Sequence, residues 1–179
     1  MGLTVAKGGT ETITNTELRY DDSEQPASSV TYTVTGGLAN GQLELTTNPG
    51  VAVNSFTQDD IDNNRLVYVH DGSEGPTDTF IYEVTDGNGG TDTATVTITI
   101  TPVNDPPVIT GQTPDPLSTM EETPLAITLA NLIVTDPDNT YPGDFTLSTQ
   151  DGANYGRVGN TITPDTGFNG TLTVPATVN

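Results

Sequence analysis

The chain has 179 residues, and 24 acidic side chains against 4 basic ones give it a formal net charge of −20. Four scattered cations cannot form the basic surface that nucleic-acid binding requires, and the absence of cysteine excludes disulfides and thiolate zinc sites. We therefore expect no nucleic-acid partner. No apolar run approaches the roughly 18 residues that cross a bilayer, so we expect no membrane insertion either.

Threonine, which occurs 35 times, alternates with aliphatic and aromatic residues along much of the chain. A period of two is typical of strands with one buried face. It predicts strands at 30–35, 42–46, 65–69, 79–85 and 91–101. In the last of these, Ala94, Val96, Ile98 and Ile100 face one way and the threonines face the other. We interpret the threonine row as a solvated face, with recognition of ice or sugar as the alternative.

A single helical turn is expected at 57–62, where Thr57 and Asp60 have the spacing of a capping box. The overlapping residues 60–64 imitate the start of an EF-hand calcium loop, but Arg65 stands where that loop requires glycine. We therefore favour a capped turn. His70, the single histidine of the sequence, lacks the partners of a catalytic triad or a zinc site, so we expect a structural role for it and no enzyme activity.

The alternating pattern stops at 102–107, where Pro106 and Pro107 cannot donate to a strand ladder and hold the chain extended. We place a domain boundary there. The prediction is a first domain at 1–103, a proline-rich calcium linker at 104–107 and a second domain at 108–179.

The second domain repeats landmarks of the first, which indicates two copies of one kind of module. Ile13, Thr14 and Leu18 recur 114 residues later as Ile127, Thr128 and Leu132. Residues 68–71 recur 94 residues later as 162–165, and Phe80, Tyr82 and Val84 recur as Val174, Ala176 and Val178. The sequence contains no counterpart of the 91–101 strand after these positions. We therefore expect the second domain to be incomplete at its C-terminal strand.

Several short motifs recur in a fixed order. In the first domain they are Gly8-Gly9-Thr10, Leu18 to Glu24, Phe56-Thr57-Gln58-Asp59-Asp60-Ile61, Tyr68-Val69-His70-Asp71-Gly72, Val84-Thr85-Asp86-Gly87 and Val103-Asn104-Asp105-Pro106-Pro107. In the second they are Glu121-Glu122-Thr123-Pro124, Thr135-Asp136-Pro137-Asp138-Asn139 and Phe168-Asn169-Gly170-Thr171. This set resembles the chondroitin sulfate proteoglycan (CSPG) repeat and the cadherin-like tandem repeats of large bacterial surface adhesins. The resemblance implies an all-β fold of tandem Greek-key β-sandwiches, Ig-like or cadherin-like.

The resemblance further implies Ca²⁺ at the domain junctions. The composition agrees, because aspartate outnumbers glutamate by 16 to 8 and Ca²⁺ takes about six to eight oxygen ligands, several of them carboxylates. Carried over by position, the junction between the domains would use Asp71, Asn104, Asp105, Asp136 and Asp138. A second cluster, at the free end of the first domain, would use Asp22, Glu24 and Asp86.

Two departures from the family pattern remove ligands from these sites. Lys7 stands where the family carries an acid, and the aspartate expected after Asn179 is missing from the sequence. The alternative reading of all the turn acids is that they cap backbone amides in Asx-turns.

The sequence therefore predicts a non-catalytic extracellular repeat module of a large cell-surface or secreted adhesin, bacterial by its resemblance and rigidified by Ca²⁺ to act as an extender. Its partners would be neighbouring repeats of the same chain, and the molecule would be a monomer. The alternative is a β-sandwich module that mediates adhesion directly by binding carbohydrate or protein at a cell surface.

Overall fold

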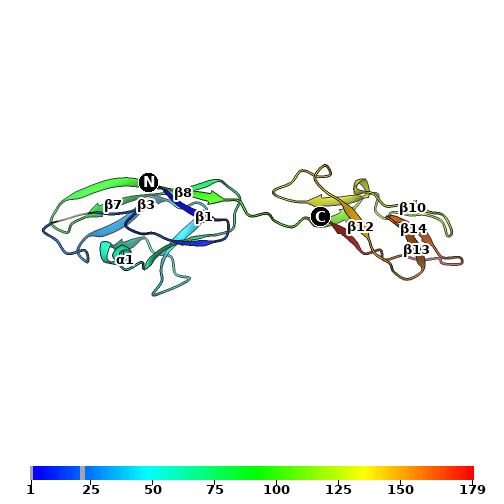
Figure 1. Ribbon diagram of the computed structural model, residues 1–179, viewed down its shortest axis with the longest axis horizontal. Helices are drawn as coiled ribbons and strands as arrows, with labels where there is room; N and C mark the ends of the chain where they lie inside the picture. Colours follow the sequence, from blue (N-terminus) through cyan, green and yellow to red (C-terminus); the bar gives the residue numbers. More distant parts are fainter. Residues whose placement is uncertain (1, 21–22) are drawn as a thin grey trace. The chain divides into compact units, whose positions relative to one another are not determined.

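The computed structural model describes residues 2–20 and 23–179, and the chain divides into two compact units. Unit 1 comprises residues 1–103 and unit 2 comprises residues 104–179 (Figure 1). The regular elements of both units are almost all β-strands, which confirms the predicted all-β class. In the described part of the chain, no helix is long and apolar enough to cross a membrane.

Unit 1 is a sandwich of two sheets around one core. Its elements are β1 (Gly2–Ala6), β2 (Thr10–Thr12), β3 (Thr31–Gly37), β4 (Gly41–Leu45), β5 (Ser55–Thr57), α1 (Gln58–Asp62), β6 (Leu66–His70), β7 (Thr77–Thr85) and β8 (Thr91–Thr101). One sheet has the order β1-β8-β7-β3-β5 and the other has the order β2-β6-β4. Paired strands are antiparallel except β1 and β8, which are parallel. Consecutive strands β3 and β4 lie in different sheets, as in the predicted Greek-key sandwich.

The alternation read from the sequence sets the inner faces of these sheets. In β8, Val96, Ile98 and Ile100 are buried, and the threonines between them are exposed. Ala94 is exposed, contrary to the prediction, because the core begins only at Val96 and the first five residues of β8 are all exposed. The buried positions of β8 join Tyr68 of β6, from the other sheet, in one core.

Helix α1 begins at the capping box that the sequence predicts. The hydroxyl of Thr57 accepts a hydrogen bond from the Asp60 backbone amide at 3.2 Å, and the Asp60 carboxylate accepts one from the Thr57 amide at 2.9 Å. Arg65 forms ion pairs with Asp59 and Asp60. Asp62 accepts hydrogen bonds from the side chains of Asn15 at 3.0 Å and Gln58 at 2.9 Å. Both carboxylates of the EF-hand-like segment, Asp60 and Asp62, are therefore engaged within unit 1.

A buried carboxylate joins β7 to the β3–β4 turn in unit 1. Asp78 accepts hydrogen bonds from the backbone amides of Ala39 at 3.0 Å, Asn40 at 3.1 Å and Thr79 at 2.8 Å. It also accepts one from the hydroxyl of Tyr68 at 2.8 Å. Burial raises the pKa of Tyr68, and the hydrogen bond to the neighbouring carboxylate raises it further.

This raised pKa predicts that unit 1 loses stability above about pH 10. Folding holds the Tyr68 proton more tightly, so the contribution is complete below the unfolded pKa and falls as the pH rises toward the folded pKa. Urea unfolding between about pH 8 and pH 11 should show a shallower decline in Tyr68→Phe than in the wild type. Some decline remains, because burial also raises the pKa of Tyr82. Equal slopes in the two proteins would contradict the prediction.

Unit 2 has shorter strands and smaller sheets. Its elements are β9 (Val108–Gln112), β10 (Leu125–Ala126), the 3-10 turn η1 (Leu129–Asn131), β11 (Leu132–Thr135), β12 (Leu147–Thr149), β13 (Tyr155–Val158), β14 (Thr161–Pro164) and β15 (Ala176–Val178). They form three sheets with the orders β10-β14-β13, β11-β9 and β12-β15.

The pairing in unit 2 follows the internal repeat. The sheet β10-β14-β13 corresponds in order to β2-β6-β4, with β10 and β14 at the repeat positions of β2 and β6. The Ile127 amide donates to the Asn160 carbonyl at 2.9 Å, as the Ile13 amide donates to the Leu66 carbonyl at 3.0 Å. Pair β12-β15 repeats pair β3-β7 in the same way. The two units therefore share one strand plan over these elements.

Candidate metal centre at the start of unit 2

The pairing of β9 with β11 gathers polar side chains at one edge of unit 2. Val108, at the start of β9, lies opposite Thr135, at the end of β11. The segments just before β9 and just after β11 are therefore neighbours. Their polar residues are Asn104, Asp105, Asp136, Asp138 and Asn139, and we call this set the acidic cluster.

Hydrogen bonds hold the acidic cluster together. The Asp105 amide donates to an Asp138 carboxylate oxygen at 2.6 Å, and the Asn139 side chain donates to Oδ1 of Asn104 at 3.2 Å. The amides of Asp138 and Asn139 each donate to Oδ1 of Asp136 at 2.8 Å. The structure thus brings together four of the predicted site residues.

One oxygen of this cluster has no partner. Oδ2 of Asp136 is buried and accepts no hydrogen bond, although an unsatisfied buried polar atom is costly and calls for an explanation. The amide donors of the turn satisfy only Oδ1, which is the Asx-turn role. Oxygen-only donors and an unpartnered carboxylate oxygen fit a hard cation such as Ca²⁺. Within residues 2–20 and 23–179, however, no group of three or more His, Asp or Glu is arranged to hold a metal ion.

Asn139 is a member of the cluster that the residue-by-residue prediction left out. It lies in the Asp136-Pro137-Asp138-Asn139 motif, one position beyond the last predicted ligand. Its side chain links the two halves of the cluster through Asn104. That contact depends on the pairing of β9 with β11, which no local pattern in the sequence indicates.

Asp71, the fifth predicted ligand, belongs to unit 1. It follows β6 and accepts a hydrogen bond from the Ser73 amide at 2.8 Å, which is an Asx-turn contact. Lys7, which replaces a family acid, forms an ion pair with Glu74. Joining Asp71 and the acidic cluster at one ion stays a prediction.

The second predicted cluster is only partly described. Asp22 lies outside the described residues. Glu24 is exposed in the segment between β2 and β3. Asp86 lies in the β7–β8 turn and accepts hydrogen bonds from the amides of Asn88 at 2.7 Å and Gly90 at 3.0 Å. The turn-capping alternative therefore accounts for Asp86.

His70 has a structural role, as its sequence context indicates. It is buried at the end of β6, where its Nδ1 accepts hydrogen bonds from the amides of Gly8 at 3.0 Å and Gly72 at 2.9 Å. It thereby joins the turn after β1 to the turn after β6.

Comparisons with known proteins give the family of this chain. A family model described as Cadherin-like matches residues 1–100. The human extracellular matrix organizing protein FRAS1 is 31% identical over 182 residues, which cover 92% of this chain and 4% of that protein. Extracellular matrix protein 3 of Lytechinus variegatus is 37% identical over 87 residues, which cover 48% of this chain and 3% of that protein.

Human chondroitin sulfate proteoglycan 4 is 33% identical over 119 residues, which cover 60% of this chain and 5% of that protein. The chain thus spans only about one twentieth of the length of these relatives or less. Among solved structures, Drosophila N-cadherin EC1-4 matches with a TM-score of 0.45 and 19% identity, over 92% of this chain and 39% of that chain.

These findings confirm the resemblance drawn from the motifs, while the bacterial source stays a prediction because the relatives named above are animal proteins. The chain belongs to the Cadherin-like family and is a β-sandwich repeat module of the CSPG kind that occurs in extracellular matrix proteins.

Proposed function

We propose that the chain is a non-catalytic spacer of a large extracellular adhesive protein, and that Ca²⁺ bound by the acidic cluster stiffens the linker before unit 2. The observation that carries the proposal is the buried, unpartnered Oδ2 of Asp136 beside Asp105 and Asp138. Its relatives named for the extracellular matrix support the extracellular setting.

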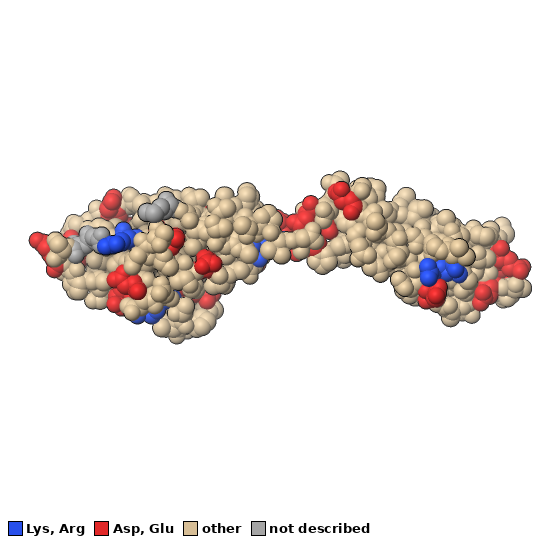
Figure 2. Space-filling model, viewed as in Figure 1, with Lys and Arg blue, Asp and Glu red and all other residues tan. Residues whose placement is uncertain are grey.

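The proposed mechanism is electrostatic. Figure 2 shows exposed acidic side chains on both units and few basic ones, and unit 2 has a single cation, Arg157. Without a counterion, the carboxylates of the cluster repel one another and oppose an ordered linker. Asn104, Asp105, Asp136 and Asp138 would hold the ion, which would supply positive charge that cancels this repulsion.

Calcium is expected to raise the melting temperature of unit 2. A ligand at one hundred times its Kd stabilises the folded state by about 2.7 kcal/mol, which corresponds to roughly 11–22 °C for a domain of this size. Thermal melting and solution scattering, each with Ca²⁺ and with chelator, check the two parts of the proposal. Calcium should also narrow the distribution of overall lengths.

Two double variants distinguish calcium binding by the acidic cluster from its capping of the turn amides. Asp136→Asn with Asp138→Asn keeps side-chain oxygens that cap the turn but removes two charges, so the calcium response should disappear. Asp115→Asn with Asp151→Asn changes the charge equally outside the cluster, and the response should persist. A rise in melting temperature without a change in scattering would reject the stiffening. No response in either measurement would reject the calcium site.

Direct binding of a glycan or protein is less well supported. Such sites favour exposed aromatic side chains. The six tyrosines and four phenylalanines of the chain all lie in its described part, and each is buried or half-buried.

A further inference from the structure

Three asparagines of the chain are followed by glycine, and the structure holds them in different surroundings. The pairs are Asn40-Gly41, Asn88-Gly89 and Asn169-Gly170. In such a pair the glycine nitrogen reaches the side-chain carbonyl carbon of the asparagine, because glycine has no side chain to obstruct the approach. A bond between these two atoms closes a succinimide ring. The reaction requires a side chain that turns toward the next nitrogen and space for the ring, so the folded structure decides which pair reacts.

Asn40 is held in place by its neighbours in unit 1. Its side-chain Nδ2 donates a hydrogen bond to the Thr77 carbonyl at 3.2 Å, and its backbone amide donates one to Asp78 at 3.1 Å. Gly41 is the first residue of β4, and a Cβ atom built on it would lie 2.6 Å from the hydroxyl oxygen of Tyr68. The amide that would have to leave is therefore engaged, and the backbone at Gly41 is packed too closely to rearrange into a ring.

Asn88 lies in the β7–β8 turn without these restraints. It is exposed, and within residues 2–20 and 23–179 its side-chain amide makes no hydrogen bond. The turn is held through the backbone, since the amides of Asn88 and Gly90 donate to Oδ1 of Asp86 at 2.7 Å and 3.0 Å. Gly89 has a φ of 105°, and no atom lies within 4 Å of a Cβ atom built on it. The Asn88 side chain is therefore able to turn toward the Gly89 nitrogen, and the ring has space to form.

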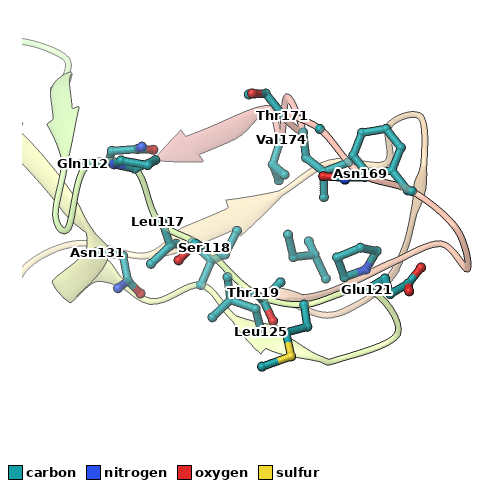
Figure 3. Close-up of a pocket in the computed structure, with 18 of the residues that line it drawn as sticks. Gln112, Leu117, Ser118, Thr119, Glu121, Leu125, Asn131, Asn169, Thr171 and Val174 are labelled. Atoms are coloured by element: carbon teal, nitrogen blue, oxygen red, sulfur yellow. The ribbon is translucent and has the colours of Figure 1, made fainter.

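The third pair lies in unit 2. Asn169, labelled in Figure 3, is exposed and lines a cavity of about 650 Å³. A Cβ atom built on Gly170 would lie 3.3 Å from the ring of Phe168, so this pair has less space than Asn88-Gly89. The two pairs of unit 1 differ most in their surroundings and give the sharper comparison.

We propose that Asn88 is a modification site that converts spontaneously to aspartate and isoaspartate in the folded chain, whereas Asn40 is protected. The Gly89 nitrogen forms a bond to Cγ of Asn88, the bond from Cγ to Nδ2 breaks, and Nδ2 leaves as ammonia with the proton that the Gly89 nitrogen gives up. Water then opens the ring. Breaking the new bond to Cγ gives aspartate, and breaking the bond to the backbone carbonyl carbon gives isoaspartate. One water is consumed, one ammonia is released and nothing is oxidised or reduced.

The product changes both the charge and the backbone of the β7–β8 turn. The new carboxylate stands two positions from Asp86, and like charges at this spacing repel each other. Isoaspartate also adds one methylene to the backbone that joins β7 to β8. Each copy of the chain therefore becomes more acidic with age at one exposed turn of unit 1. This inference depends neither on calcium nor on the proposed spacer function.

Timed incubation of the full chain tests the proposal, in buffer below its melting temperature and in urea that unfolds it. Trypsin cleavage after Arg65 and Arg157 then places Asn40, Asn88 and Asn169 on three different fragments for mass spectrometry. In buffer, Asn88 should convert at least about tenfold faster than Asn40, because the hydrogen bonds of Asn40 must break before it reacts. In urea the two rates should be equal, since both residues precede glycine.

Asn88→Gln is the matched variant. It keeps an amide in the turn, but its additional methylene disfavours closure of the ring, so the fragment that contains position 88 should stay unconverted. Four results would overturn the proposal. They are an Asn88 that stays intact in buffer while it converts in urea, equal rates at Asn40 and Asn88 in buffer, conversion that persists in Asn88→Gln, and a product that is aspartate alone, because direct hydrolysis of the amide passes through no ring.

Discussion

Replacing Asp78 with Ala is expected to lower the free energy of unfolding of unit 1 by about 3–5 kcal/mol. The Asp78 side chain is 5% exposed and accepts hydrogen bonds from three backbone amides and the Tyr68 hydroxyl. Ala removes the acceptor for all of them and leaves donors without partners inside the protein. Each such donor costs about 1–3 kcal/mol when water cannot replace the lost acceptor.

Amide exchange at β6, measured in urea, assigns the lost free energy of unfolding to unit 1. Tyr68→Phe is the matched control, since it removes a single donor from the same carboxylate and should cost only about 1 kcal/mol. Amide exchange at β14 reports unit 2 and should stay unchanged in both variants. A loss below about 1 kcal/mol for Asp78→Ala would mean that water reaches the freed donors.

The same position shows what the sequence can and cannot predict about this fold. Leu172 occupies the repeat position of Asp78, and its apolar side chain fits the two-residue period. Asp78 breaks that period, so the prediction began its strand at 79, whereas β7 begins at Thr77. Its burial depends on donors from the β3–β4 turn, which lie about 40 residues away and leave no local signal.

Strong periodicity, by contrast, predicts an element to its ends. The 91–101 strand has the predicted bounds because its alternation is unbroken for the whole of β8. Short strands such as β5 (Ser55–Thr57) went unpredicted, since three residues cannot display a period and pairing with β3 creates the strand. Likewise, the motifs indicate the acids of the cluster, but the contact between Asn104 and Asn139 follows only from the pairing of β9 with β11.

The largest contrast between the units is expected at a matched pair of isoleucines. Ile13 and Ile127 have the same repeat position and equivalent backbone hydrogen bonds. Ile13 is fully buried, whereas Ile127 is half-buried and lines the cavity. Ile13→Ala should therefore cost unit 1 about 3–4 kcal/mol, from lost transfer energy and a new void. Ile127→Ala should cost unit 2 about 1–2 kcal/mol, because its side chain is already partly hydrated and no closed void forms.

Amide exchange at β6 and β14 measures the two losses separately in urea, and Ile→Val at each position provides a graded control. The contrast follows from the difference in burial between the two side chains, since the residue type and the backbone hydrogen bonds are the same. Equal costs in the two units would show that unit 2 already excludes water from this position.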